Sequence, residues 1–377
     1  MKYAHAAHRR RNVTALCSLA VLAVLVVVGF SFSSSASAAT TPVLSVNSSG
    51  QITNAGVAWQ LRGVDKSGSE YACVQNLGIM TGDSTQTGIN AMLGWHVNAV
   101  RIPLNEDCWL GINGVPAVYS GTKYTTAITN YVNLLASNGM VAILDLHWSA
   151  PGTELATKQQ PMADADHSVT FWKSVATTYK PKTNVIFDVF NEPYSISWSC
   201  WKSGGCTATD AISAKKYTVT GMNSLISAIR STGATNPVEA NGLQWGNDLS
   251  GWLTNKPTDA SKKLIAGAHV YDINACKTTS CWNTYYKPIT ATNPLVISEY
   301  GSKSACTSTF ETTATTGLLP WADSVSGKKV SYLGWSWNAA ACTAPSLVTN
   351  TSTGAATSTY GSGIKTYYQK KPALPSN

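Results

Sequence analysis

The sequence predicts a (β/α)8 barrel in a single domain, and three observations support this fold class. Eight short apolar runs recur along the chain, as expected for parallel strands that are buried on both faces. Stretches with helical periodicity separate most of these runs. The chain has 377 residues, a length typical of such barrels. A doubly wound open sheet is the alternative, but the G-x-G-x-x-G turn that often accompanies it is absent.

The expected elements follow one another in the order that a barrel requires. Strands are predicted at 59–64, 98–104, 140–148, 185–191, 237–241, 264–271, 294–300 and 331–337. Helices are predicted at 85–95, 123–138, 164–179, 208–231 and 307–326. The segments after the fifth and sixth strands carry little helical signal. Residues 46–58 predict a small β-hairpin that closes the bottom of the barrel.

The first 38 residues predict an export signal. Basic residues at 8–11 precede an apolar run at 15–32, and Ala36-Ser37-Ala38 matches a small-residue cleavage site. An uncleaved membrane anchor is the alternative, because the apolar run is just long enough to span a bilayer. The cleavage motif favours removal of residues 1–38. We therefore expect a secreted catalytic domain, residues 39–377, that is monomeric and has no stable membrane association.

Charge and cysteine content fit an exported protein that does not bind nucleic acid. The chain has 27 basic and 19 acidic residues, and four of the basic ones lie in the candidate signal. The remaining basic residues are scattered and do not form the basic stripe that a nucleic-acid-binding protein needs. The absence of a Cys-x-x-Cys motif argues against zinc, and we expect no metal and no cofactor. Disulfides account for the eight cysteines after Cys17 better than a zinc site does. Local spacing suggests the pairs Cys200–Cys206 and Cys276–Cys281. The four cysteines left over would then form Cys73–Cys108 and Cys306–Cys342.

Two carboxylates stand at the carboxyl ends of predicted strands, where barrel active sites are built. Glu192 follows the fourth strand and Glu299 the seventh, and these strands face each other across an eight-stranded barrel. Either glutamate alone would more commonly be a surface residue or an ion-pair partner. Two facing carboxyl groups with different pKa values suit glycoside hydrolysis. The acids inside the strands are interpreted as buried structural carboxylates: Asp145, Asp188 and Glu239.

Aromatic and histidine side chains also follow the strands, which favours a sugar-binding cleft. Flat indole rings stack on the C–H faces of sugars, and the chain has 13 tryptophans. His147 and His269, at the ends of the third and sixth strands, are expected to contact substrate, because no H-E-x-x-H pattern indicates a metal. Trp95 and Trp172 are assigned to the core. The tryptophans expected in the cleft are Trp148, Trp198, Trp201, Trp245, Trp282, Trp335 and Trp337.

Six motifs in order resemble glycoside hydrolase family 5, a family of retaining (β/α)8 barrel glycosidases. They are VRIPL, LDLHW, FNEP, HVY, SEYG and GWSWN. The resemblance implies that Glu192 is the general acid/base and Glu299 the nucleophile. The other implied contacts are Asn191 to the sugar 2-hydroxyl, Arg101 and Tyr271 to the nucleophile, His147 and His269 in the same subsite, and Trp335 (or else Trp337) as its platform.

The resemblance further implies a retaining β-glycosidase acting on an oligo- or polysaccharide, first of all an endo-β-1,4-glucanase. The same mechanism on mannan, xylan, β-1,3-glucan or a diglycoside is an alternative, as is a non-catalytic carbohydrate-binding barrel. Asp65 departs from the family, which commonly has Asn there, and is expected to contact substrate or pair with Lys66. Two cysteine-containing loops, 105–110 and 197–210, are expected to shape the outer subsites.

Overall fold

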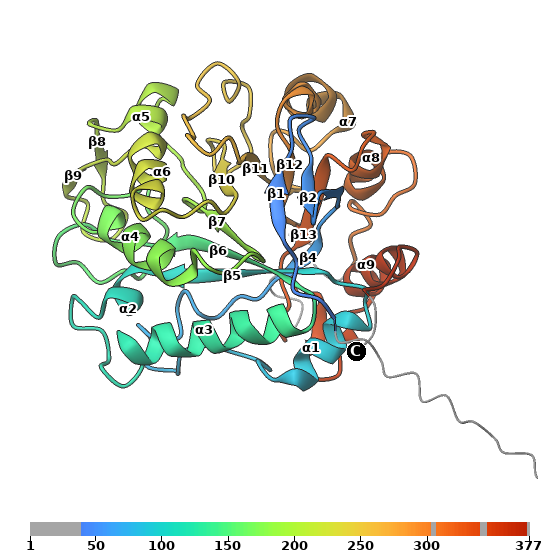
Figure 1. Ribbon diagram of the computed structural model, residues 1–377, viewed down its shortest axis with the longest axis horizontal. Helices are drawn as coiled ribbons and strands as arrows, with labels where there is room; N and C mark the ends of the chain where they lie inside the picture. Colours follow the sequence, from blue (N-terminus) through green and yellow to red (C-terminus); the bar gives the residue numbers. More distant parts are fainter. Residues whose placement is uncertain (1–38, 303–306, 340–344, 375–377) are drawn as a thin grey trace, which may run out of the picture. The chain divides into compact units, whose positions relative to one another are not determined.

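The computed structural model describes residues 39–302, 307–339 and 345–374. Eight parallel strands close into a barrel in chain order, with helices outside them (Figure 1). All eight predicted strands are present, so the predicted fold class is confirmed. The barrel strands are β4 (Arg62–Asp65), β5 (Ala99–Asn105), β6 (Val141–Trp148), β7 (Val185–Asp188), β10 (Val238–Asn241), β11 (Leu264–Tyr271), β12 (Leu295–Gly301) and β13 (Val330–Gly334).

The longer helices follow the strands, and shorter ones lie in the loops. The longer helices are α1 (Gln86–Leu93), α3 (Thr122–Ser137), α4 (Ser168–Tyr179), α6 (Met222–Ser231), α8 (Leu318–Ser324) and α9 (Thr359–Gln369). The short ones are α2 (Glu106–Leu110), α5 (Trp198–Ser203) and α7 (Thr279–Cys281), with a π-helical turn at Trp282–Tyr286 and a 3-10 turn at Lys287–Ala291. The weak helical signal after the fifth and sixth predicted strands agrees with the structure: turns without a helix follow β10, and α7 with the π-helical and 3-10 turns follows β11.

Two of the predicted helices are partly wrong. The expected helix 208–231 begins only at Met222, because its first half forms a hairpin of β8 (Thr207–Thr209) and β9 (Lys216–Thr218). Asp210 turns this hairpin: its carboxylate accepts hydrogen bonds from the backbone N–H groups of Ile212 and Ser213. The expected helix 307–326 is reduced to α8, and turns occupy 307–317.

The predicted N-terminal hairpin is a three-stranded antiparallel sheet of β1 (Leu44–Val46), β2 (Ile52–Asn54) and β3 (Val57–Ala58). Leu44 and Ile52 are buried and belong to the apolar cluster that fills the lower barrel. The sheet therefore covers the end of the barrel at which the strands begin, as the sequence predicts.

The barrel interior is apolar at one end and charged at the other. Alternate residues of a strand point to opposite faces, so every second side chain points inward. The inward layer near the strand starts is apolar and includes Leu61, Ala99, Val141, Ile186, Ile265, Val296 and Leu333. The next layer toward the carboxyl ends is polar and fully buried, and it includes Asp65, Arg101, Asp145, Asp188, Glu239 and Asn241. A second apolar cluster packs the helices around the barrel.

Three of the four predicted disulfides are confirmed: Cys73–Cys108, Cys200–Cys206 and Cys276–Cys281. The predicted pair Cys306–Cys342 and the predicted signal at 1–38 lie outside the described residues. Within the described ranges, every helix is too short or too polar to cross a bilayer.

Candidate active site

The structure brings Glu192 and Glu299 together at the carboxyl end of the barrel. One oxygen of each carboxyl and one ring nitrogen of His269 all lie within 4.8 Å of one another. The Glu192 side chain is 21% exposed, whereas that of Glu299 is 4% exposed. Two carboxyls and an imidazole at such distances could also hold a metal ion, so the partners of each oxygen determine which chemistry the group favours.

Both oxygens of Glu299 accept hydrogen bonds from protein donors. Arg101 donates from Nη1 to Oε1 at 2.7 Å, and the Tyr271 hydroxyl donates to Oε2 at 2.6 Å. Each Glu299 oxygen therefore already has a protein donor. These donors provide the environment that an ionised carboxylate requires in a buried position.

Glu192 lies in a different environment. Burial raises its pKa to about 7, although the positive charges of His147 and Arg101 oppose this effect. Its Oε1 lies 2.9 Å from Nδ1 of His269, whose own pKa burial lowers to about 3. His269 is therefore a neutral hydrogen-bond partner, and Glu192 carries its proton below about pH 7. One carboxyl of the pair is set up to carry a proton and the other to carry a charge.

Arg101 is the centre of the buried polar layer. Its guanidinium donates to Glu299 and also reaches Asp65 at 3.2 Å, Asp145 at 3.0 Å and Asp188 at 2.9 Å. One arginine cannot neutralise four acids, and burial raises the pKa of Asp65 well above its usual value and that of Asp188 to about 7. Asp145 and Asp188 are thus buried structural partners, as interpreted from the sequence.

Asp65 does not pair with Lys66, which corrects one sequence-based expectation. Asp65 lies opposite Arg101 in the β4–β5 register, and both side chains point into the barrel. Lys66 follows on the other face, where its Nζ donates to the carbonyl of Thr81 and lies over the ring of Tyr131. The alternation of strand side chains separates these neighbours.

Glu239 is fully buried in the same layer, as interpreted from the sequence. Neither of its carboxyl oxygens has a hydrogen-bond partner among the described atoms. Burial raises its pKa well above the usual value, and the nearby Asp188 adds to this effect. Both effects favour the protonated form of Glu239 in the barrel core.

Asn191 and His147 lie beside the two glutamates. The Asn191 amide oxygen accepts from Arg101 Nη2 at 2.7 Å, and its Nδ2 donates to Gln159 Oε1 at 2.8 Å. Burial disfavours the charge on His147, but the Asp145 carboxylate, 2.8 Å from its Nδ1, outweighs burial and raises the pKa to about 9. The His147 ring stacks on Trp335, with centroids 5.6 Å apart.

Gln159 was not identified from the sequence. It lies in the long loop between β6 and α4, and its Nε2 also donates to the carbonyl of Glu192 at 3.3 Å. Its contacts join a loop residue to both members of the Asn191-Glu192 pair. A glutamine in an irregular loop belongs to no motif or periodic pattern, so the sequence carries no signal for it.

The tryptophans predicted for the cleft divide into two groups. Trp335 and Trp148 are half-buried, and Trp245 is 47% exposed and stacks on Tyr194 with centroids 4.8 Å apart. Trp198 is also half-buried and packs on a buried neighbour. The expectation is wrong for three others, which are buried in the core and donate their indole N–H to backbone carbonyls: Trp201, Trp282 and Trp337. Trp337 therefore offers no platform, and Trp335 remains the candidate.

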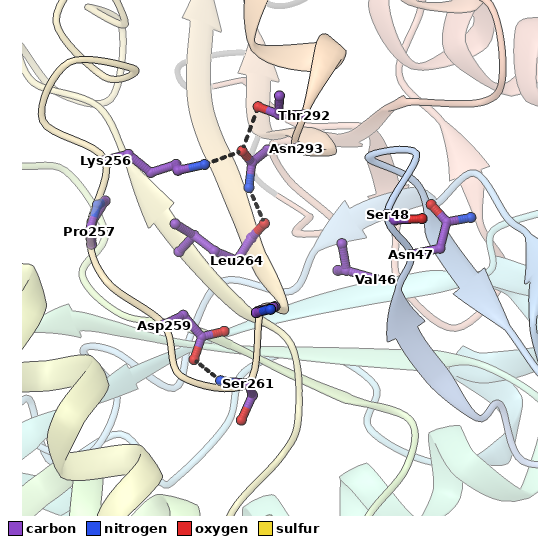
Figure 2. A pocket seen from close by; sticks show the side chains of 11 residues that line it. Val46, Asn47, Ser48, Lys256, Pro257, Asp259, Ser261, Leu264, Thr292 and Asn293 are labelled. Atoms are coloured by element: carbon purple, nitrogen blue, oxygen red, sulfur yellow. Dashed lines mark hydrogen bonds between the residues drawn. The ribbon is translucent and has the colours of Figure 1, made fainter.

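A separate pocket of about 480 Å³ lies at the amino ends of β11 and β12, beside the β1–β2 turn (Figure 2). Figure 2 shows Asn293 joined by hydrogen bonds to Lys256 and Leu264: it accepts from Lys256 Nζ at 3.2 Å and donates to the Leu264 carbonyl at 2.9 Å. None of the predicted site residues lines this pocket. It lies at the barrel end opposite to the two glutamates.

Comparison with curated proteins finds distant endoglucanases. Endoglucanase CelA of Streptomyces lividans is 26% identical over 218 residues, which are 57% of this chain and 41% of that protein. Endoglucanase MaCel5A of Microbulbifer sp. (strain ALW1) is 28% identical over 139 residues, which are 37% of this chain and 24% of that protein. The matched region thus spans less than half the length of these relatives.

Solved structures share the fold over nearly the whole domain. A β-glucanase of Saccharophagus degradans, SdGluc5_26A, solved with cellotetraose, has a TM-score of 0.63 at 17% identity, covering 88% of this chain and 94% of that one. Cellulase Cel5C_n has a TM-score of 0.61 at 17% identity, covering 89% and 95%. The sequence model of cellulase, glycosyl hydrolase family 5, matches residues 52–341. The chain therefore belongs to glycosyl hydrolase family 5, a family of retaining glycoside hydrolases.

Proposed function

We propose that the protein is an endo-β-1,4-glucanase in which Glu299 is the nucleophile and Glu192 the general acid/base. The observation that carries this proposal is the close approach of two carboxyls in opposite environments, within 4.8 Å of each other. Retaining glycosidases place these groups about 5 Å apart, whereas inverting enzymes need a wider gap for a water molecule. Arg101 and Tyr271 bind both oxygens of Glu299, and burial keeps the proton on Glu192.

The proposed reaction proceeds in two displacements. The Glu299 carboxylate attacks the anomeric carbon while Glu192 gives its proton to the leaving glycosidic oxygen, so one C–O bond forms as the other breaks. The departing sugar leaves a covalent glycosyl-enzyme and an ionised Glu192. Glu192 then takes a proton from water, and the hydroxide formed attacks the same carbon and releases Glu299. Two inversions give net retention.

The surrounding residues position the sugar at the cleavage point. Asn191 is held by Arg101 and Gln159 with its amide beside both glutamates, where it can donate to the sugar 2-hydroxyl. Trp335 is fixed by stacking on His147, and its half-exposed ring suits a sugar face. His269 contacts Glu192 rather than open space, so we assign it to positioning the acid/base.

Trp245 extends the proposed cleft on the side of Glu192. Its backbone N–H donates to the carbonyl of Pro193, the residue after Glu192, at 3.0 Å. Because Glu192 protonates the leaving group, this side receives the departing part of the chain. Trp245 has one face on Tyr194 and is 47% exposed, which suits stacking on a further sugar ring.

The choice of a β-1,4-glucan rests on the relatives. The curated matches are endoglucanases, and SdGluc5_26A was solved with cellotetraose. We extend this activity to the present chain as a secreted, monomeric catalytic domain, residues 39–377, released from a signal at 1–38. The disulfides and the apolar N-terminal run support export.

A variant and a substrate panel test this proposal. Glu299→Ala should abolish hydrolysis of an aryl β-cellobioside, and unchanged turnover would exclude the mechanism. Carboxymethylcellulose, mannan, xylan and β-1,3-glucan, with product chromatography, identify the preferred linkage. NMR of the first-formed sugar should show retention of the β-anomer. Binding of cello-oligosaccharides without turnover would instead favour a carbohydrate-binding barrel.

A further inference from the structure

A second cluster of acids and histidine lies outside the proposed active site. Glu106 begins α2 directly after β5, and Asp164 and His167 lie just before α4. One possible ligand atom of each lies within 4.8 Å of the other two. Glu106 and Asp164 are fully buried, and the His167 side chain is 23% exposed. The imidazole thus forms the side of the cluster that solvent can reach.

The cluster is buried without a matching positive side chain. In the part of the chain that the structure describes, no lysine or arginine forms an ion pair with Glu106, with its buried neighbour Asp107 or with Asp164. The nearest basic group is His167, whose Nδ1 lies 3.9 Å from Asp164 Oδ1. Buried acids are stable only when they are paired, protonated or bound to a metal ion.

One atom of the cluster lacks any partner. Glu106 Oε1 accepts from the Ser168 hydroxyl at 2.7 Å, but Oε2 is enclosed and has no hydrogen bond among the described atoms. Asp164 is oriented from outside: its Oδ1 accepts the backbone N–H groups of Asp166 and His167. The Ser168 hydroxyl also lies 3.1 Å from Asp164 Oδ2, so Glu106 Oε2 is the enclosed oxygen of the two acids that is open to a further contact.

We propose that Glu106, Asp164 and His167 bind one divalent transition-metal ion, with Zn²⁺ as the best match to the donor set. Carboxylate oxygens and an imidazole nitrogen are ordinary zinc ligands, and water completes the coordination. The imidazole favours Zn²⁺ over Ca²⁺, which prefers oxygen ligands. The ion supplies the charge that this buried group lacks.

The bound ion would join two loops beside the candidate active site. The Cys73–Cys108 disulfide links α2 to the segment before α1. Asn105, the residue before α2, donates from its side-chain amide to the carbonyl of Ala156 in the β6–α4 loop. The same loop carries Gln159. Metal binding would therefore stabilise the wall of the cleft, and this inference does not depend on the substrate proposed above.

Metal content, calorimetric titration with Zn²⁺ and thermal unfolding test the site directly. The test uses the full chain with the substitution Glu299→Gln, after treatment with a chelator. This substitution removes one carboxylate from the other possible metal-binding group, which consists of Glu192, His269 and Glu299. We expect one Zn²⁺ per chain and a rise in Tm on its addition. Glu106→Gln and His167→Asn should each weaken binding by about 100-fold or more, since even losing a residue that only supports a ligand costs about 10- to 100-fold. Glu311→Gln is the matched control, because Glu311 is equally buried with an unpartnered oxygen.

The competing arrangement is a proton shared by Glu106 and Asp164. It predicts no bound Zn²⁺, no Zn²⁺-dependent rise in Tm, and a Glu106→Gln variant as stable as the parent. That result would overturn the proposal, and so would unchanged Zn²⁺ binding in both ligand variants. His167→Asn leaves the buried acids intact, so it decides the question even if Glu106→Gln fails to fold.

Discussion

Glu192 should set the first alkaline limb of the pH–rate profile. As the proposed acid it acts only when protonated, and burial raises its pKa to about 7. Rising pH removes the proton, so kcat/KM should fall about tenfold per pH unit above that value. At pH 9, two units above the pKa, the rate limited by Glu192 should be about 1% of its plateau.

Glu192→Gln identifies the source of this limb. The amide keeps the size of the side chain and cannot give up a proton, so hydrolysis of a cello-oligosaccharide should fall by about 10²- to 10⁴-fold. The residual rate should no longer change around pH 7. A glycoside of an acidic phenol needs little proton donation, so its initial burst of phenol should be nearly unaffected.

The assay is kcat/KM between pH 4 and 10 for the parent and the variant. His147, whose pKa Asp145 raises to about 9 against the effect of burial, should produce a further change near pH 9 in both proteins. A limb near pH 7 that survives in Glu192→Gln would assign it to another group and refute the role of Glu192. A parent profile that is flat from pH 6 to 9 would refute it as well.

Three further substitutions test the surrounding contacts. Arg101→Met leaves four buried acids without their shared cation and should lower the unfolding free energy by about 3–5 kcal/mol, measured by denaturant titration. Gln159→Ala releases the amide of Asn191 and should lower kcat about 10-fold with little change in Tm, whereas an unchanged kcat would exclude a positioning role. Trp245→Ala should raise KM for long oligosaccharides about 2- to 10-fold, since it removes a stacking contact of about 0.5–1.5 kcal/mol. An equal rise in KM for short substrates would contradict the placement of Trp245 in an outer part of the cleft.

The barrel could be predicted from the sequence because its signals are local. Buried parallel strands are short apolar runs, and each of the eight runs became a strand. The polar residues after them lie at one end of the barrel because parallel strands all end there. Glu192 and Glu299 could therefore be brought together from sequence alone. The disulfides of five and six residues' separation, Cys276–Cys281 and Cys200–Cys206, were predictable for the same reason.

Features that depend on which way a side chain points were harder to predict. Trp337 lies two residues after Trp335, and Trp201 and Trp282 lie in short helical segments of the loops, yet the indole N–H groups of all three donate to backbone carbonyls in the core. The segment 208–218 has helical composition, but the carboxylate of Asp210 ties a tight turn between β8 and β9 instead. Local composition gives no information on either outcome, because tertiary partners decide both.

The polar layer of the barrel shows why site geometry exceeds what the sequence carries. Arg101 contacts Asp65, Asp188 and Glu299 at separations of 36, 87 and 198 residues. Each acid alone would be unstable in the barrel, and each is tolerated because the same guanidinium reaches it or because it keeps a proton. Asp188 thus shares with the proposed nucleophile, Glu299, the guanidinium that contacts both, a link that no local pattern in the sequence reveals.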